Sequence, residues 1–544
     1  MTLTKTQRLK ALLSSGYFPQ ELPPPFNTTD FGTHRKSLKA AWPKHSPPKT
    51  IPEIYNLPRI GRKRRSLSIT NPISQFFLAD EISENWVKIK KYIDSSKTAL
   101  EKPSIKKEGR AVQKPDFTMI QMMRLQAAGN YDQILLSDIS RFYGTIYTHT
   151  LPWALHGKTW CKANLNQPDL EKSLGNRLDK LVRKGQDNQT IGIPIGPDTS
   201  RILSEIIAVG VEKRFLELNK SDGLSAFRFI DDWFIGHDGA EPAETAIRHL
   251  AEACADFELE LNLEKTEILS PVDPVLESWP SELRELMIAD ALTTTDKSAK
   301  EQESALNRFF SHAYQLARSR PDQNVMDYAL KLARSFRIAR DNYILFESFV
   351  LRAARAYPIT LPTVAHILIN YRSQGAPISR ARCSKLIHDM VRSAAPLRHT
   401  EEVAWALFLA KGLRIEVRSR ELESVCNSTS SVWALLCLDL DAMGLIEGTL
   451  DKKYWSSLAN KESLTDATWL LAYEAVMKGW LNPVNNYLYD HPWFGPMAKR
   501  KISFYDTHAN VPTFEKSRNA TFSQAKRRLK DLPALVSSLM LNYE

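Results

Sequence analysis

The stretch Phe229-Ile230-Asp231-Asp232-Trp233-Phe234 places two adjacent carboxylates between two short apolar runs. Aromatic and β-branched residues on both sides of an acidic turn predict a β-hairpin with Asp231 and Asp232 at its tip. Neighbouring carboxylates repel each other, so a fold keeps them together most readily where they share a cation. The hairpin therefore predicts a cation site whose further ligands come from elsewhere in the chain.

A third carboxylate follows a predicted buried strand upstream of the hairpin. The apolar run that begins at Ile134 ends in Asp138, and the aromatic residues Phe142 and Tyr143 follow four and five residues later. Between the two acidic sites lies a glycine- and proline-rich loop, Gly192 to Arg201, in front of an apolar helical pattern. Its Thr-Ser pair at 199–200 is the expected N-cap of that helix.

Beyond the hairpin the pattern changes from helical to strand-like. Apolar residues at three- and four-residue spacing between Ile247 and Phe257 predict a helix. Leu259, Leu261 and Leu263 then alternate with polar residues and predict a strand. The predicted order is strand, loop and helix, hairpin, helix, strand, with the acids on the first strand and the hairpin.

This order resembles the palm of reverse transcriptases, and four blocks are similar to that family's motifs in sequence and in order. They lie around Asp138, at Gly192 to Arg201, at Phe229 to Asp232, and at Asn262 with Lys265-Thr266. A fifth block, Pro58 to Leu67, resembles the fingers hairpin that grips the triphosphate. The resemblance covers roughly residues 50 to 275. It implies an α+β fingers–palm domain.

The resemblance also implies a two-metal nucleotidyl transfer. Two Mg²⁺ ions about 3.5–4 Å apart, or Mn²⁺ as a substitute, would stabilise the attacking 3′-oxygen and the leaving oxygen. Asp138 and Asp231 are the implied ligands, Asp232 is a further ligand or an orienting group, and the backbone carbonyl of Ile139 completes the set. A solvated acidic turn with a strand cap is the alternative interpretation of these acids.

Further residues are implied to bind the nucleotide. Tyr143 would act as a steric gate under the sugar and select deoxynucleotides, unless it is a core aromatic beside Phe142. Lys265 would neutralise or protonate pyrophosphate, unless it is a surface lysine. Arg59 and Arg65 match triphosphate-binding positions of the fingers, and Gly196 lies in the positioning loop. The remaining basic residues of the turn, Arg62, Lys63 and Arg64, fit either a solvated turn or a nonspecific contact with nucleic acid.

Composition agrees with a nucleic-acid partner. The 544 residues include 73 Lys plus Arg and 62 Asp plus Glu, a net charge of +11 that suits polyanion binding. The five cysteines are scattered without metal-ligand spacing, which predicts a reducing cytoplasm and no disulfide framework. No apolar run is long enough to span a membrane, and no apolar segment follows the first residues as in a signal peptide.

The chain divides into four predicted regions: an extended leader that docks on the fingers (1–50), the fingers (51–130), the palm (131–280) and an all-α, helical-repeat-like half (281–544). The last region shows successive amphipathic patterns with short polar or proline breaks and almost no strand-like alternation. Helices are predicted at Val325–Ile338, Tyr343–Ala356, Pro362–Tyr371, Glu401–Leu413, Ser430–Ala442 and Asp466–Trp480.

A palm followed by a large helical half resembles the bacterial defence-associated or abortive-infection (Abi) reverse transcriptases. The resemblance implies DNA synthesis from dNTPs in anti-phage defence, with a DNA product, a template-independent and protein-primed reaction in some relatives, and homo-oligomers formed through the helical half. No tyrosine stands out as primer, although Tyr543 lies near the end of the sequence.

Other functions remain as alternatives. The first is a templated RNA-directed DNA polymerase of a retron or mobile intron, which uses an RNA template. A non-catalytic binding protein and a nucleotide cyclase are less favoured, because neither needs all five blocks. The spacing of Arg382 with His388 and of Arg392 with His399 is also near that of helical ribonuclease motifs, but arginine and histidine are frequent on basic helices.

Overall fold

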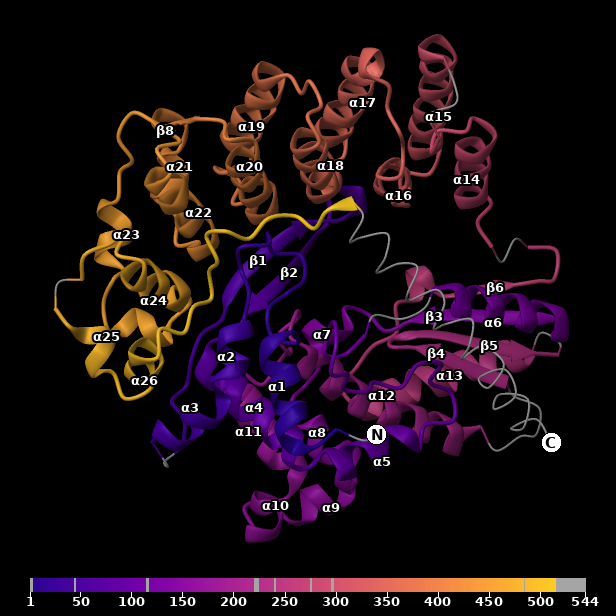
Figure 1. The fold of residues 1–544 in the computed structure, drawn as a ribbon. Coiled ribbons are helices and arrows are strands. Elements are labelled where there is room, and N and C mark those ends of the chain that lie inside the picture. Colours follow the sequence, from indigo (N-terminus) through magenta and orange to yellow (C-terminus); the bar gives the residue numbers. More distant parts are fainter. Residues whose placement is uncertain are drawn as a thin grey trace.

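The computed structural model describes residues 3–43, 46–113, 117–219, 225–238, 241–273, 276–294, 298–483 and 485–514. An α+β part is followed by a helical part, as predicted, and Figure 1 shows the later helices arching over the earlier part. Before the central sheet the chain forms a hairpin of β1 (Glu53–Pro58) and β2 (Arg64–Ile69) and six helices. These are α1 (Lys5–Ser14), α2 (Thr29–Thr33), α3 (Arg35–Ala41), α4 (Pro72–Glu84), α5 (Trp86–Asp94) and α6 (Phe117–Asn130).

The central sheet is antiparallel, with the strand order β4-β5-β3-β6. Its strands are β3 (Gln133–Asp138), β4 (Ser225–Phe229), β5 (Asp232–His237) and β6 (Glu267–Leu269). The predicted strand at 259–263 is wrong, because the chain makes only an isolated bridge there, between Ile139 and Leu261. A 3-10 turn, Leu263–Lys265, then carries the chain to the actual edge strand β6.

Two layers of helices cover the sheet. Alternate side chains such as Ile134, Phe227 and Phe234 form a small apolar cluster with α6 on one face. On the other face, Leu135, Trp233 and Ile235 join the main hydrophobic core, next to α12 (Asp198–Leu218) and α13 (Glu241–Asp256). Between β3 and α12 lie five shorter helices: α7 (Phe142–Thr145), α8 (Thr150–His156), α9 (Lys158–Ala163), α10 (Pro168–Lys172) and α11 (Leu174–Lys184).

Helix α12 begins earlier than predicted. Its first residue is Asp198 and its N-cap is Pro197, with no side-chain cap, so the predicted cap at Thr199 or Ser200 is wrong. The Asp198 carboxylate instead accepts hydrogen bonds from Arg110 Nε and from the backbone N–H of Val112, both at 2.7 Å. Contacts with a distant segment therefore decide where this helix starts.

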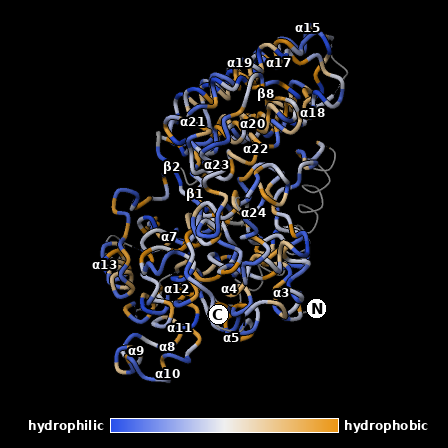
Figure 2. Tube along the Cα trace, turned by 90° about the vertical axis from the view of Figure 1, so that its left-hand side faces the viewer, coloured by the Kyte–Doolittle hydropathy of each residue, from blue (hydrophilic) through white to orange (hydrophobic). Residues whose placement is uncertain are grey.

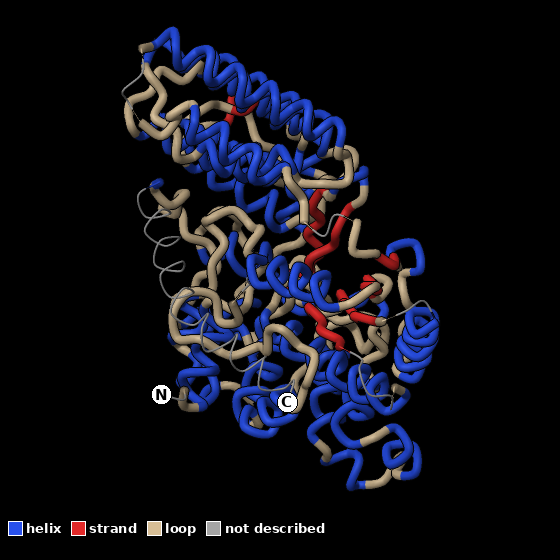
Figure 3. Tube along the Cα trace, turned by 90° about the vertical axis from the view of Figure 1, so that its right-hand side faces the viewer, coloured by secondary structure: helices blue, strands red, loops and turns tan. Residues whose placement is uncertain are grey.

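The second part is helical, as predicted, apart from a two-residue parallel pairing of Val417–Arg418 with Ile446–Glu447. All six predicted helices are present: the one at Tyr343–Ala356 has the predicted bounds, and the other five differ at one or both ends. Successive helices pack side by side. Figure 2 shows hydrophilic and hydrophobic residues alternating along them, and Figure 3 shows the strands of the α+β part below the array. The longer helices are α14 (Trp279–Ala289), α15 (Ala299–Ser319), α16 (Val325–Ala333), α17 (Tyr343–Ala356), α18 (Leu361–Ser373), α19 (Arg380–Ala394), α20 (Thr400–Leu413), α22 (Ser431–Ala442) and α24 (Trp469–Met477). Short ones are α21 (Glu423–Cys426), α23 (Lys453–Ser457), α25 (Tyr487–Asp490) and α26 (Phe494–Lys499).

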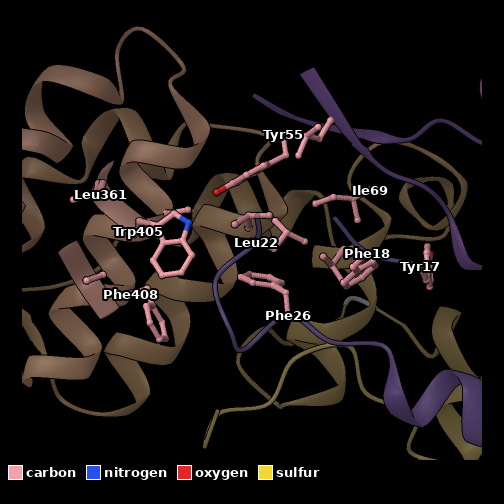
Figure 4. Packing of buried hydrophobic residues seen from close by; sticks show 14 of the residues in the cluster. Tyr17, Phe18, Leu22, Phe26, Tyr55, Ile69, Leu361, Trp405 and Phe408 are labelled. Atoms are coloured by element: carbon pink, nitrogen blue, oxygen red, sulfur yellow. The ribbon is translucent and has the colours of Figure 1, made fainter. Parts of the chain in front are cut away.

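The N-terminal segment joins the two parts of the chain. It contains α1 to α3, so the prediction of an extended leader is wrong in its conformation. Tyr17 Oη donates to the carbonyl of Thr70 at 2.5 Å, next to the β1–β2 hairpin. The Trp405 indole on α20 donates to the carbonyl of Glu21 at 3.0 Å, and Figure 4 shows Leu22 and Phe26 between the two parts. The main hydrophobic core is continuous across both parts.

The five cysteines are buried free thiols. Among the described helices, none combines the length and the apolar composition that a membrane crossing requires.

Candidate active site

The acidic hairpin has a two-residue turn. Phe229 pairs with Asp232, so Ile230 and Asp231 form the turn and Asp232 begins β5. Ile230 has a φ of 59°, a left-handed conformation that a β-branched residue rarely adopts. Such a residue costs about 1–3 kcal/mol and persists only where the surroundings enforce it. The turn that carries Asp231 is therefore held in place by the rest of the fold.

The sheet brings the three predicted aspartates together. Asp138 ends β3 directly opposite Asp232 on β5, and Asp231 precedes Asp232 in the turn. Asp138 also accepts a hydrogen bond from the N–H of Asn262 through its backbone carbonyl, at 2.7 Å. Side chains on directly opposed residues of an antiparallel pair are neighbours, and like charges there repel each other.

This repulsion shows in the pKa values of two of the aspartates. Burial, followed by the charges of Asp232 and Asp138, raises the pKa of Asp231 to about 7. Burial and the Asp138 charge raise the pKa of Asp232 to about 6, against the opposing effects of Lys265 and Arg124. Both carboxylates are thus held where their ionised forms are disfavoured, and a cation would relieve that cost.

Lys265 contacts the acidic group directly. Its Nζ lies 2.6 Å from Oδ2 of Asp138, while its side chain remains 64% exposed. Next to this pair, the hydroxyls of Ser137 and Thr266 lie 3.0 Å apart and tie β3 to the chain before β6. The structure therefore brings the predicted Lys265 to the carboxylates, with enough exposure to meet a ligand.

The residues present fit Mg²⁺ by their chemistry. Mg²⁺ prefers one or two carboxylates together with substrate phosphates and water to a complete protein cage. Asp138 and Asp231 supply hard oxygen donors whose mutual repulsion a divalent cation relieves. In the described part of the chain, no group of three or more His, Cys, Asp or Glu side chains is arranged as a complete metal site. A metal site that two carboxylates and the substrate complete together agrees with the ligand preference of Mg²⁺ and with the lack of a complete protein site among the described residues.

Ile139 follows Asp138 and is buried. It forms a bridge with Leu261 in which the neighbouring residues make the hydrogen bonds: Ser140 N–H donates to Glu260, and Asn262 N–H donates to Asp138. In such a non-hydrogen-bonded pair, the carbonyl of Ile139 points away from Leu261. The carbonyl therefore points to the side of β3 on which the acidic hairpin lies. The predicted role of this carbonyl as a metal ligand requires that direction.

Tyr143 lies close to the hairpin. Burial raises its pKa against the opposing effects of the Arg201 charge and the Ser204 hydrogen bond, and the Asp231 charge adds to the increase. Ser204 Oγ on α12 lies 3.0 Å from the Tyr143 hydroxyl oxygen, and the ring of Phe142 packs edge-on against it. The tyrosine is thus fixed between α12 and the acidic site and is not a free surface residue.

The basic residues of the β1–β2 hairpin separate into two groups. Burial and the charge of Arg65 lower the pKa of Arg59, and the charges of Asp138 and Asp231 counteract this, so Arg59 interacts electrostatically with the acids. Arg65 is exposed on β2. Arg64 instead makes a bidentate contact with Glu402 on α20, at 2.8 and 2.7 Å, which rules out a solvated turn for this residue. The side chain of Arg62 lies outside the described part.

Gly196 has a packing role in the loop before α12. Its φ is 129°, and a Cβ at this position would lie 2.7 Å from Pro19 of the N-terminal segment. Its carbonyl accepts a hydrogen bond from Arg110 Nη2 at 2.6 Å. Only glycine combines this conformation with such a close approach. Its predicted contact with substrate remains a prediction.

Sequence reasoning missed a buried ionic cluster beneath the hairpin. Arg228 on β4 is fully buried and donates to Glu205 and Glu212 on α12, at 2.6 and 3.2 Å. Its Nη1 also donates to the carbonyl of Ile230 at 3.2 Å, inside the turn that carries Asp231. Glu212 further accepts from Ser96 Oγ and Thr98 N–H, at 2.5 and 3.1 Å. We infer that Arg228 is a positioning residue for the hairpin.

The signal for this cluster was present in the sequence. Arg228 interrupts the apolar positions Phe227 and Phe229 directly before the acidic turn. Glu205 and Glu212 are seven residues apart in an otherwise apolar helix, a spacing that puts both on one face. A charge inside an apolar strand together with two acids inside an apolar helix predicts a buried ion pair.

The pairs considered as ribonuclease motifs have structural contacts. Arg382 Nη2 donates to Ser348 Oγ at 2.6 Å, and His388 is buried, with its Nε2 accepting from the N–H of Arg418 at 3.3 Å. His399 Nδ1 lies 3.5 Å from Glu402. These contacts hold neighbouring segments of the helical half together, so they explain these residues by their role in packing.

Comparison with known proteins agrees with this geometry. Residues 90–301 match the family model described as "Reverse transcriptase (RNA-dependent DNA polymerase)". This part of the chain is a reverse transcriptase domain. The domain includes all the predicted acidic residues and Tyr143, whereas the β1–β2 hairpin and most of the helical array lie outside the match. The match supports RNA-directed DNA polymerase as the enzyme class.

Two further comparisons give little detail. No curated protein sequence matches the chain. Among solved structures, telomerase from Candida albicans in complex with a fragment of telomeric RNA is similar over 69% of this chain and 68% of its own, at 10% identity and a TM-score of 0.27.

The raised pKa of Asp231 predicts how the reverse transcriptase domain responds to pH. The folded-state value of about 7 lies above the ordinary 3.8, so the folded state binds this proton more tightly than the unfolded state. Without metal, we expect the free energy of unfolding to fall as the pH rises from about 4 to 7. Urea titrations at several pH values, with EDTA and then with Mg²⁺, measure this. Mg²⁺ should reverse the loss at pH 8, and a stability independent of pH in both series would contradict the prediction.

Proposed function

We propose that the chain adds dNTPs to a growing DNA strand in antiviral, anti-phage defence, without a template and with a protein tyrosine as primer. The observation that carries the defence assignment is the large helical half that follows the reverse transcriptase domain and packs against the β1–β2 hairpin through Glu402 and Arg64. The blocks Ser137 to Tyr143 and Pro197 to Arg201 support it, because they resemble the Abi group more than the intron enzymes.

In this proposal each residue of the site has a separate task. Asp138 and Asp231 would hold Mg²⁺, with Asp232 beside them and the Ile139 carbonyl as a further oxygen donor; the bound metal supplies charge stabilisation of the attacking and leaving oxygens. Lys265 would neutralise the pyrophosphate or donate a proton to it. Arg59 and Arg65 would bind the triphosphate oxygens, for which guanidinium groups are well shaped.

A templated reaction is the second candidate. The family match is to RNA-dependent DNA polymerases, which favours an RNA template of the kind used by retron or mobile-intron enzymes. The division into fingers, palm and helical domains at residues 50, 130 and 280, location in the cytoplasm and self-association through the helical half also remain predictions. The candidate primer Tyr543 lies outside the described residues.

One experiment separates the two candidates. Purified protein is incubated with labelled dNTPs and Mg²⁺, with and without an RNA template and primer, and the product is treated with nuclease or protease. Labelled DNA that forms without template and shifts in size after protease supports the first candidate. Protein-free product that requires added RNA supports the second, and no incorporation under any condition would contradict both.

The electrostatic effect of Asp231 on Tyr143 points to a test of sugar selection. Removing the ring in Tyr143→Ala should open space for a 2′-hydroxyl. The preference for dNTPs over rNTPs should then fall by about 10–100-fold, the usual size of discrimination by steric contact. Incorporation of each nucleotide is measured at matched concentrations. Tyr147→Ala is the control, because its ring packs against His149 and Trp153 instead. An unchanged preference in Tyr143→Ala would remove the gate.

A further inference from the structure

A cavity of about 630 Å³ lies between the β1–β2 hairpin and the helical half. One wall is the turn of the hairpin, with Arg59, Ile60 and Lys63. The facing wall comes from the ends of α15 and α17 and the start of α16, with Arg318, Met326 and Tyr357. Figure 1 shows the tip of the hairpin ending beside α16 and α18. The volume falls in the range of small-molecule pockets, about 300–1,000 Å³.

The charges that line this cavity do not cancel. Arg64 is paired with Glu402, at 2.7 Å, and Asp327 is paired with Lys331, also at 2.7 Å. Arg59, Lys63 and Arg318 make no ion pair with any described residue. The cavity as a whole therefore carries an excess of positive charge, with unpaired cations on both of its walls, which suits an anionic ligand with more than one charged group.

Between the cations the lining is apolar. Ile60, Met326, Ile359 and the half-buried ring of Tyr357 contribute to it. Positive groups along a path, together with an aromatic ring, are the combination that binds single-stranded nucleic acid without sequence preference: the cations contact phosphates and the bases stack or pack on apolar surface.

The cavity adjoins the polymerase site through Arg59. This residue lines the cavity and also interacts electrostatically with Asp138 and Asp231. A strand in the cavity would thus continue toward the acidic hairpin. The cations lie on separate elements, Arg59 and Lys63 on the hairpin and Arg318 on α15, an arrangement that suits the successive phosphates of a strand.

We propose that this cavity binds a short segment of single-stranded nucleic acid next to the polymerase site, and that the helical half supplies one of its walls. The biological purpose of this binding site rests on the proposed polymerase function. The site itself is formed in part by the helical half, which the polymerase motifs do not include.

The test is strand binding measured without catalysis. A fluorescent 12-nucleotide homopolymer, as DNA and as RNA, is titrated with protein in EDTA without dNTPs, at several salt concentrations. The double variant Lys63→Gln/Arg318→Gln should bind more weakly, and the slope of log K against log salt should shrink by about 0.7 for each phosphate that the variant no longer neutralises. Tyr357→Leu should weaken binding about tenfold, because the bases can no longer stack on the ring.

A matched control is available on the same helix. Lys300 is exposed near the start of α15, whereas Arg318 is near its end, so Lys300→Gln removes an equal charge far from the cavity. It should change neither the affinity nor the salt slope by as much as Arg318→Gln. Thermal unfolding of each variant checks that the fold is retained, which the exposure of Lys63 and Arg318 favours.

The outcomes separate this inference from the proposed function. If the cavity variants bind the strand as wild type does, or if they lose only binding of labelled dNTP, the inference is wrong even where DNA synthesis is active. If wild type makes no DNA but strand binding falls in the cavity variants and not in Lys300→Gln, the inference holds and the polymerase proposal fails.

Discussion

The variant Asp231→Asn should lose dNTP incorporation by at least about a thousandfold. Stabilisation of reacting oxygens by a metal contributes several kcal/mol, and each 1.36 kcal/mol is a factor of ten in rate. Asparagine keeps the shape of the side chain in the turn between β4 and β5 but removes the charge that holds the cation. The measurement is single-turnover incorporation at saturating dNTP over a range of Mg²⁺ concentrations.

The thermal stability of Asp231→Asn should not fall with its activity. Because burial and the neighbouring charges raise the pKa of Asp231, its ionised form destabilises the folded state. The variant should therefore unfold at an equal or higher temperature than wild type at pH 8. Asp232→Asn should lose less activity, about 10–100-fold, as expected for an orienting group. Asp322→Asn, on an exposed loop of the helical half, is the control. Full activity in Asp231→Asn would show that the metal site is wrongly assigned.

Replacement of Arg228 should have the largest effect on stability. Arg228→Met leaves Glu212 and Glu205 buried without their shared cation, and breaking a buried ion pair in this way costs about 3–5 kcal/mol. It also removes the donor to the Ile230 carbonyl, so the turn that carries Asp231 is held less firmly in a conformation that isoleucine disfavours. Chemical denaturation measures the first effect.

A conservative variant tests positioning separately from folding. Arg228→Lys keeps a positive charge beside the two glutamates but cannot reproduce the several hydrogen bonds of the planar guanidinium. We expect it to remain folded and to lower kcat by about tenfold, the effect of about 1.4 kcal/mol, with little change in the KM for dNTP.

The control for this decrease in kcat is a second buried pair. Lys411 on α20 contacts Asp439 at 2.6 Å, far from the acidic hairpin, and Lys411→Met should reduce stability without lowering kcat in the protein that remains folded. If Arg228→Lys and Lys411→Met both leave kcat unchanged, Arg228 contributes to the stability of the fold but does not position the hairpin for catalysis. The same comparison can be made with Glu212→Gln, which weakens the cluster from the α12 side.

Local patterns were sufficient to predict the elements that carry the acidic residues. Phe229 to Phe234 predicts a hairpin because both flanks prefer strand and the acids favour a turn, and Asp138 follows a run that is too apolar to lie on the surface. The resemblance to the reverse transcriptase palm implied that these acids share one site, and the register of β3 with β5 places Asp138 opposite Asp232. The helices of the second half were predictable for a similar reason, since each carries its own apolar periodicity.

Other features depend on residues that are distant in sequence. Whether Arg64 lies in solvent or on Glu402 depends on where α20 packs, and the start of α12 depends on Arg110 and Val112, which bind Asp198. The edge strand was misplaced because the Leu259 to Leu263 alternation fits a strand, whereas the bridge to Ile139 is followed by a 3-10 turn.

The sequence by itself determined which residues are predicted to carry the chemistry: Asp138, Asp231, Asp232, Tyr143 and Lys265 stand in blocks that resemble the motifs of a known family. Only the tertiary structure decided how these residues are held, through the buried charges of Arg228, Glu205 and Glu212, and what faces them, through the cavity between the hairpin and the helical half. The physical reason is that a turn or a helix follows from neighbouring side chains, whereas the partner of a buried charge and the shape of a cavity are set by packing between segments that lie far apart in the sequence.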